Sequence, residues 1–142
     1  MADLNVPTLM FVAYRSVESR VLAAVLDAGY PITLAQARIV QRIGPNGTRL
    51  TQLAEQAQVT KQTAGALVDQ LVAAGYVERR PDPTDARARL VGMSEEGRKV
   101  WAVAADELER VQAQWAQHLG AGEWAELQRT LTRLREITDP YA

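Results

Sequence analysis

The segment TQLAEQAQVTKQTAGALVDQLVAAGY, residues 51–76, constrains the fold more than any other part of the chain. Thr51 can cap a short helix over residues 52–57, and Thr60 can cap a second helix over residues 61–74. The two residues between these helices break the helical pattern, and a glycine follows the second helix as a left-handed stop. Two short helices joined by so tight a turn predict a helix-turn-helix.

Both helices of this segment carry apolar residues at helical spacing, and together these form one face. The set consists of Leu53, Ala54, Ala57, Val59, Ala64, Leu67, Val68 and Leu71. The small side chains of Ala54 and Ala64 allow the two helices to cross closely. We therefore expect this set to form the core of the motif.

The next stretch, ERRPDPTDARARL, predicts a β-hairpin. Residues 76–80 can form one strand with Val77 on one face, and residues 87–91 can form its partner with Leu90 turned inward. The sequence PDPTDA, residues 81–86, is too rich in proline for a strand ladder, so we expect it to be the loop. A hairpin directly after a helix-turn-helix is a wing.

Four further helices are predicted around this unit. A first helix opens at Pro7 or Thr8 and ends before Gly29, and a second follows a capping box formed by Thr33 and Gln36. After the wing, Ser94 is a good N-cap for a long helix with a single apolar seam. The predicted ranges of the last three of these helices are 34–43, 95–119 and 124–137. The order of elements thus predicts a mainly α chain with a small β-wing.

Composition excludes several kinds of function. The chain has no cysteine, which removes disulfides and thiolate chemistry, and it has one histidine, His118, which is too few for a typical zinc site. The sequence also lacks a nucleophile–base constellation and a phosphate-binding glycine loop. We therefore expect no enzymatic activity, no metal and no cofactor. No apolar run approaches about 18 residues and the N-terminus lacks signal-peptide features, so we expect a cytoplasmic protein without membrane contact.

Charge is spread unevenly along a chain whose net charge is −1. Residues 1–30 carry two basic and three acidic side chains, residues 31–92 carry eight and five, and residues 93–142 carry six and nine. The middle segment therefore has a net charge of +3 between two acidic flanks. Such an excess is compatible with ordinary scatter, and also with a nucleic-acid surface, because phosphate binding needs local positive charge.

Three motifs between Leu50 and Ser94 resemble those of the MarR family of bacterial transcription regulators. They are L-T-x-L-A, then V-T-x-x-x-A-x-x-L-V-D-x-L-x-x-x-G-Y-V-x-R, then D-A-R-A-R-L-V-G-M-S. The sequence departs from the family in its two wing prolines and in Gln58, where glycine is common. The resemblance implies a single chain, 1–142, with a winged helix-turn-helix DNA-binding lobe over 31–93 and a helical dimerisation region over 1–30 and 94–142.

The resemblance also implies a function. It predicts a homodimer that binds double-stranded DNA at a palindromic operator and acts as a repressor, released by a small aromatic effector. Three residues are candidates to line the effector pocket, namely Tyr14, Arg15 and Tyr30. The alternative interpretation is a winged-helix protein-interaction module that binds no specific DNA, which the acidic total would allow. Loss of DNA affinity with rising salt would distinguish the two.

The second helix of such a motif presents its N-terminal residues to base edges in the major groove. The candidates are Thr60, Lys61, Gln62, Thr63 and Ala66. Gln62 suits adenine, Lys61 suits guanine or phosphate, and Ala66 suits a thymine methyl. The competing interpretation is a solvated helix start, and Thr60 serves equally well as a cap only.

The family resemblance places an arginine of the wing, Arg87, in the minor groove, where narrow A·T-rich DNA attracts cations. We expect Asp85 and Asp69 to orient this arginine, since carboxylates repel phosphate. Arg79 and Arg89 are further candidates for DNA contact. Because strand residues alternate between faces, the arginines of the hairpin cannot all point at DNA.

Overall fold

The computed structural model describes residues 3–141, and these form a mainly helical chain with one three-stranded antiparallel sheet. This architecture confirms the predicted fold class. The elements in chain order are α1 (Val6–Asp27), α2 (Leu34–Val40), β1 (Thr48–Arg49), α3 (Leu50–Ala57), α4 (Lys61–Ala73), β2 (Val77–Asp82), β3 (Asp85–Met93), α5 (Glu95–Leu119) and α6 (Ala121–Thr138).

Side-chain caps set the start of most helices. Thr33 and Gln36 form the predicted capping box at α2, Thr60 accepts a hydrogen bond from the backbone N–H of Thr63, and Ser94 accepts one from the N–H of Gly97. The prediction that Thr51 caps α3 is wrong, because α3 begins at Leu50, two residues before the predicted start, and has no side-chain cap. The sequence reading also missed the cap of α1, Asn5, and placed the start of α6 three residues late.

The sheet differs from the predicted hairpin in two ways. Pro81 and Asp82 lie in β2, paired with Arg89 and Asp85, so the turn shrinks to Pro83 and Thr84. The strand order is β1-β3-β2, which puts β2 at an edge, where a proline without an N–H is tolerated. The short β1 also adds a third strand, which pairs with the other side of β3.

Burial within the wing shifts by one residue from the prediction. Val91 of β3 is buried against the core, together with Val77, which is its near neighbour on β2. Leu90 is half-buried on the opposite face and packs beside the loop before β1. Because side chains alternate along a strand, this shift decides which arginines share the face of Val91.

The core of the helix-turn-helix is close to the predicted one. Leu53, Ala64, Val68 and Leu71 are fully buried, and Ile39 of α2 joins them. The remaining predicted positions either belong to the same core or pack against it. The helical periodicity of residues 51–74 therefore identified this core correctly.

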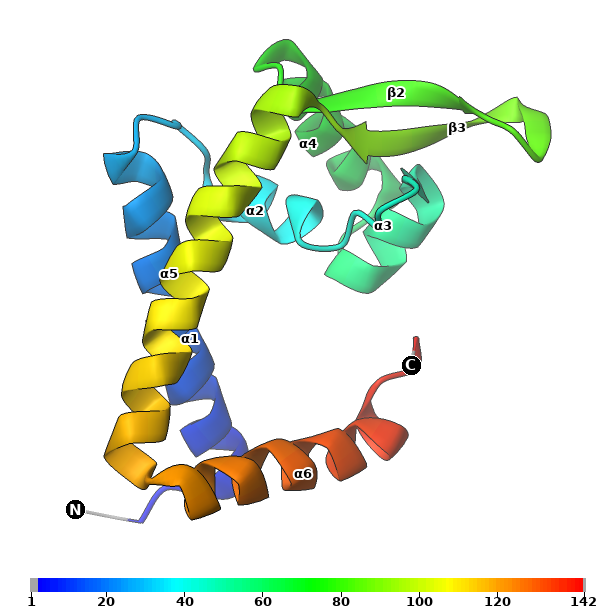
Figure 1. Ribbon diagram of the computed structural model, residues 1–142. Helices are drawn as coiled ribbons and strands as arrows, with labels where there is room; N and C mark the ends of the chain where they lie inside the picture. The colour runs from blue at the N-terminus through cyan, green and yellow to red at the C-terminus, as the bar shows by residue number, and fades with distance from the viewer. Residues whose placement is uncertain (1–2, 142) are drawn as a thin grey trace.

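The long helix α5 connects the two ends of the molecule. Figure 1 shows α1 beside α5, the helix-turn-helix and sheet at one end of α5, and α6 extending from its other end as an arm. No residue of α6 is buried. Large apolar side chains are exposed along these helices, including Leu9, Phe11, Trp101, Leu108, Leu131 and Ile137. The helices α1, α5 and α6, called the frame from here on, thus carry uncovered apolar surface. The end of α5 that meets the helix-turn-helix is well packed.

The first turn of α5 is seated on the turn that joins α4 to β2. The Ser94 hydroxyl donates to the carbonyl of Gly75 over 2.5 Å, and its N–H donates to the carbonyl of Tyr76 over 3.1 Å. Gly97 lies so close to Tyr76 that an added Cβ would overlap the Tyr76 carbonyl oxygen. This seat therefore requires a residue without a side chain at position 97.

Within residues 3–141, none of the helices combines the length and the apolar character that crossing a membrane requires.

Two glycines in helix first turns offer a matched test of the seat. Gly122 of α6 has open space around it, so Gly122→Ala should stabilise the fold by up to about 1 kcal/mol. Gly97→Ala should instead cost about 1–3 kcal/mol, because the methyl group overpacks the contact with Tyr76. Urea unfolding at one protein concentration measures both changes. A stabilising Gly97→Ala would show that the seat is not tight.

Candidate nucleic-acid interface

The N-terminal half of α4 presents one face to solvent and the other to the core. Lys61, Gln62, Thr63 and Ala66 are exposed. The core residues of the same helix lie between them at the spacing of an amphipathic helix. All four exposed residues are ones that the sequence named as candidates, and the structure brings them together on one helix end.

The two threonines at this end bind each other. The Thr60 hydroxyl accepts the N–H of Thr63 over 3.0 Å and donates to the Thr63 hydroxyl oxygen over 2.9 Å. Thr60 is therefore occupied as a cap, and its hydrogen bond also holds the side chain of Thr63. The preceding turn contains Gln58 in the left-handed region, with φ of 57°, where its side-chain amide donates to the carbonyl of Glu55.

A basic groove lies between the helix-turn-helix and the wing. Arg49, Lys61, Arg79 and Arg89 are among the residues that line it, and its volume is about 460 Å³. Among the described residues 3–141, no acidic side chain lines this groove. Four elements, β1, α4, β2 and β3, thus contribute cations to one concave surface beside the exposed face of α4. Such a surface concentrates positive potential and attracts phosphate.

The strand register separates the arginines of the hairpin. Arg79 pairs with Val91, so the two share a face, and alternation places Arg89 on it as well, whereas a bulge separates Arg87 from this register. Arg80 lies on the other face, where its guanidinium covers Gly92 and donates to the carbonyl of Met93. Two arginines of the wing, Arg79 and Arg89, therefore share the face that borders the groove, and Arg87 lies in the bulge near the wing tip.

The acidic residues have different partners from those expected. Asp69 forms an ion pair with Arg79 over 2.5 Å, and not with Arg87. Asp85 accepts a hydrogen bond from the backbone N–H of Arg87, so it fixes the main chain of that residue instead of its guanidinium group. The strand register explains why Asp69 pairs with Arg79, because Arg79 lies at the base of the wing beside α4.

Arg49 and Asp82 connect the wing tip to the start of α3, a link that sequence reasoning missed. The Arg49 guanidinium donates to the buried Asp82 carboxylate over 2.7 and 3.0 Å, and it lies 3.8 Å from Asp85. Asp82 also accepts hydrogen bonds from the hydroxyl and the N–H of Thr84. The Thr84 hydrogen bonds and Arg49 together lower the pKa of Asp82 from 3.8 to about 2.

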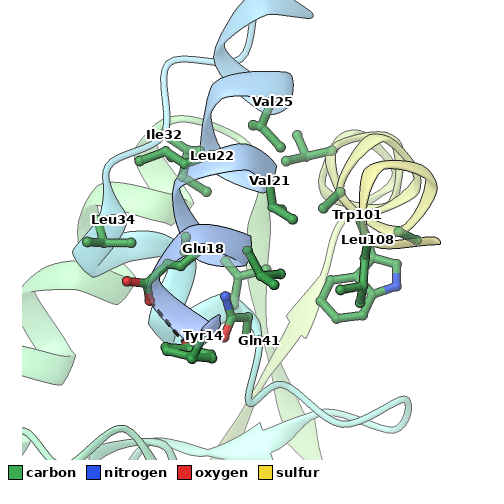
Figure 2. Close-up of a pocket in the computed structure, with 16 residues that line it drawn as sticks. Tyr14, Glu18, Val21, Leu22, Val25, Ile32, Leu34, Gln41, Trp101 and Leu108 are labelled. Carbon is green, nitrogen blue, oxygen red and sulfur yellow. Dashed lines mark hydrogen bonds between the residues drawn. The ribbon is translucent and has the colours of Figure 1, made fainter. Parts of the chain in front are cut away.

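A second cavity lies where α1 and α5 meet α2, on the side of the frame (Figure 2). Its volume is about 240 Å³, and its walls are mostly apolar, with Tyr14, Glu18 and Gln41 as polar residues. Of the three residues expected to line an effector pocket, only Tyr14 does so. Tyr30 packs edge-on against Tyr76, and Arg15 lies over the ring of Phe11.

Within residues 3–141, no group of three or more His, Cys, Asp or Glu side chains is placed to hold a metal ion.

A helix-turn-helix with a basic wing, carried on one long helix, defines a winged-helix protein. Residues 30–88 match the sequence model of the MarR family. BadR from Rhodopseudomonas palustris, named a transcriptional activatory protein, is 33% identical over 94 residues. That match covers 66% of this chain and 53% of BadR, so the chain spans about half the length of this curated relative.

Solved structures resemble the whole chain. Transcriptional regulator Tm0710 from Thermotoga maritima has 26% identity and a TM-score of 0.66, covering 94% of this chain and 93% of that one. NadR, solved in complex with 4-hydroxyphenylacetate, has 20% identity and a TM-score of 0.73, covering 96% of both chains. Over residues 30–88 the chain thus matches the MarR family, and the relatives named above include a transcriptional activatory protein and a transcriptional regulator.

Asp82 gives the wing a defined pH dependence. Because its pKa is depressed from 3.8 to about 2, its contribution to stability is complete above about pH 4 and is lost as pH falls through about 2. Asp82→Asn should therefore lower the melting temperature at neutral pH, and the difference from wild type should vanish near pH 2. Thermal melts of both proteins over this range measure it. A difference that does not change with pH would contradict the role of the carboxylate.

Proposed function

We propose that this chain is a homodimeric DNA-binding transcription regulator whose helix α4 enters the major groove while the wing follows the minor groove. The observation that carries the proposal is the exposed N-terminal face of α4 beside a groove lined by four cations. In this proposal residues 31–93 form the DNA-binding lobe, and residues 1–30 and 94–142 form the dimerisation region.

The side chains of the interface divide into three roles. Gln62 and Lys61 read base edges, and Ala66 contacts a thymine methyl, because these are exposed at the end of α4 that would meet the bases. Arg87, Arg89 and Arg79 contact minor-groove edges or phosphates from the wing. Thr63 contacts DNA in the orientation that Thr60 gives it.

Three acidic residues support this surface without touching DNA. Asp69 holds Arg79 at the base of the wing, and Asp85 holds the main chain of Arg87. Arg49 and Asp82 fix the position of the wing relative to α3. Each acid thus sets the position of one of the proposed DNA-binding arginines or of the hairpin that carries them.

Dimerisation is supported by the uncovered apolar surface of the frame. Leu9, Phe11, Leu131 and Ile137 are exposed on α1 and α6, and α6 buries none of its residues within one chain. Large exposed apolar patches are typical of protein–protein interfaces. A two-fold dimer through these helices would present two copies of α4, which suits inverted half-sites about 10 base pairs apart.

An effector would bind in the cavity between α1, α2 and α5, which lies between the frame and the DNA-binding lobe. NadR, a structural neighbour, was solved with the small phenolic acid 4-hydroxyphenylacetate, and this supports a small ligand here. In this chain, α2 connects the cavity to α4, because Gln36 donates a hydrogen bond to Gln70 over 2.9 Å. Repression stays a prediction, since its direction depends on where the operator lies relative to the promoter.

Replacing Gln62 and replacing Arg87 should reduce DNA affinity in different ways. Gln62→Ala should cost about 1–3 kcal/mol on the operator and little on random DNA, because it loses a base contact. Arg87→Ala should weaken binding to the operator and to random DNA alike. It should also lower the slope of log affinity against log salt concentration by about one per chain. Salt titrations by fluorescence anisotropy, with the intergenic DNA beside the gene as the operator source, measure both.

Exposed residues on the frame serve as controls for this comparison. Gln112→Ala and Arg133→Ala remove the same side chains from α5 and α6 and should leave affinity and salt slope unchanged. If Arg87→Ala behaves like Arg133→Ala on both DNAs, the wing does not contact DNA. If wild type shows no salt-dependent DNA binding at all, the protein-interaction alternative is favoured.

A further inference from the structure

The cavity between α1, α2 and α5 has an unusual charge pattern for a site that would hold an organic acid. Within residues 3–141, no lysine, arginine or histidine lines it, and its one charged lining residue is Glu18. Figure 2 shows Glu18, Tyr14 and Gln41 gathered at one end, and the apolar side chains of Leu22 and Val25 at the other. The cavity is therefore apolar with one polar end.

The charge of Glu18 is already balanced from outside the cavity. The guanidinium of Arg38, on α2, donates to both carboxylate oxygens, over 3.0 and 3.1 Å, and Tyr14 donates its hydroxyl over 3.1 Å. The Glu18 side chain is 7% exposed. The hydrogen bonds from Arg38 lower the pKa of Glu18, so this group stays an anion. Arg38 itself is not among the lining residues.

These contacts disfavour both charged classes of ligand. A carboxylate would find no free cation among the described residues of the cavity, because the guanidinium of Arg38 is already bonded to both oxygens of Glu18. An ammonium group would find no free anion among them, because the Glu18 carboxylate is already paired with Arg38. Either charged group would lose its hydration without gaining a counter-ion, and burying an unpaired charge is costly. The polar end can still exchange hydrogen bonds with a neutral hydroxyl through the Tyr14 oxygen and the Gln41 amide.

We propose that the effector of this regulator is a small neutral molecule with an apolar body and one hydroxyl group, and not an aromatic acid. The proposal rests on the proposed effector role of this cavity. Its volume of about 240 Å³ suits one ring with a short substituent, since an apolar cavity of about 150 Å³ holds benzene. The hydroxyl lies toward Tyr14 and Gln41, and the apolar body toward Leu22 and Val25.

Three probes that share one apolar body test this charge preference. They are 4-propylphenol, 4-propylbenzoate and 4-propylbenzylamine, which are neutral, anionic and cationic at neutral pH. Calorimetric titration of the intact wild-type protein should show the phenol binding at least about tenfold tighter than either charged probe, a difference of about 1.4 kcal/mol. Equal or tighter binding of the benzoate or the amine overturns the proposal, and so does failure of all three to bind at millimolar concentration.

Two variants of the Glu18–Arg38 ion pair should change which of the three probes gains affinity. Glu18→Gln leaves the Arg38 guanidinium without its carboxylate partner, so the affinity for 4-propylbenzoate should rise about tenfold while that for the phenol changes little. Arg38→Gln leaves the Glu18 carboxylate without its guanidinium partner and should favour the amine in the same way. Circular dichroism confirms that each variant is folded. If neither folded variant changes the preference, the ion pair does not set it, and the proposal fails.

The DNA assay separates this proposal from the function on which it rests. Saturating 4-propylphenol should weaken operator binding of wild type, whereas the benzoate at the same concentration should not. If the benzoate releases DNA and the phenol does not, the ligand class is wrong but the regulatory function stands. If wild type fails to bind DNA while the phenol still binds in calorimetry, the proposed function fails and the chemistry of the cavity stands.

Discussion

The contact between the first turn of α5 and the turn after α4 is the constraint on which the rest of the structure depends. Ser94 binds the carbonyls of Gly75 and Tyr76, and Gly97 lets the helix approach Tyr76 without a side chain between them. Helix α5 also packs against β3, and its Val100 belongs to the core that the helix-turn-helix forms, so this contact fixes the direction in which α5 leaves the helix-turn-helix (Figure 1). Any two-fold dimer through α1, α5 and α6 must therefore place the two copies of α4 in a defined relation.

The cavity between α1, α2 and α5 lies beside this contact, and α2 is bonded both to α1 and to α4. Glu18 of α1 holds Arg38 of α2, and Gln36 of α2 holds Gln70 of α4. A ligand between α1 and α5 that prefers one position of α2 would thus bias the position of α4. The physical requirement is a difference in affinity between the two arrangements, because a ligand shifts an equilibrium only by its differential binding.

Local rules predicted the fold well, and long-range contacts set the limit of that prediction. The caps of Thr33, Thr60 and Ser94 and the core of residues 51–74 follow from short spacings, which a sequence displays directly. The prediction that Pro81 lies in the hairpin loop was wrong. Proline is tolerated there because β2 is an edge strand, and the spacing of residues does not reveal which strand lies at the edge. The link from Arg49 to Asp82 joins residues 33 positions apart, and the pair formed by Glu18 and Arg38 also bridges separate helices. The residues that we propose for the DNA surface follow from the helix-turn-helix pattern, whereas the partners of their side chains do not.

The central claim is that two copies of this chain read DNA with two-fold symmetry through α4 and the wing. A hydroxyl-radical footprint of the protein on the intergenic DNA beside its gene tests this claim most directly. The account predicts two protected segments related by a two-fold centre and about 10 base pairs apart, with protection of the flanking minor grooves where the wings lie. A single unsymmetrical segment, or no protection at low salt, would contradict it.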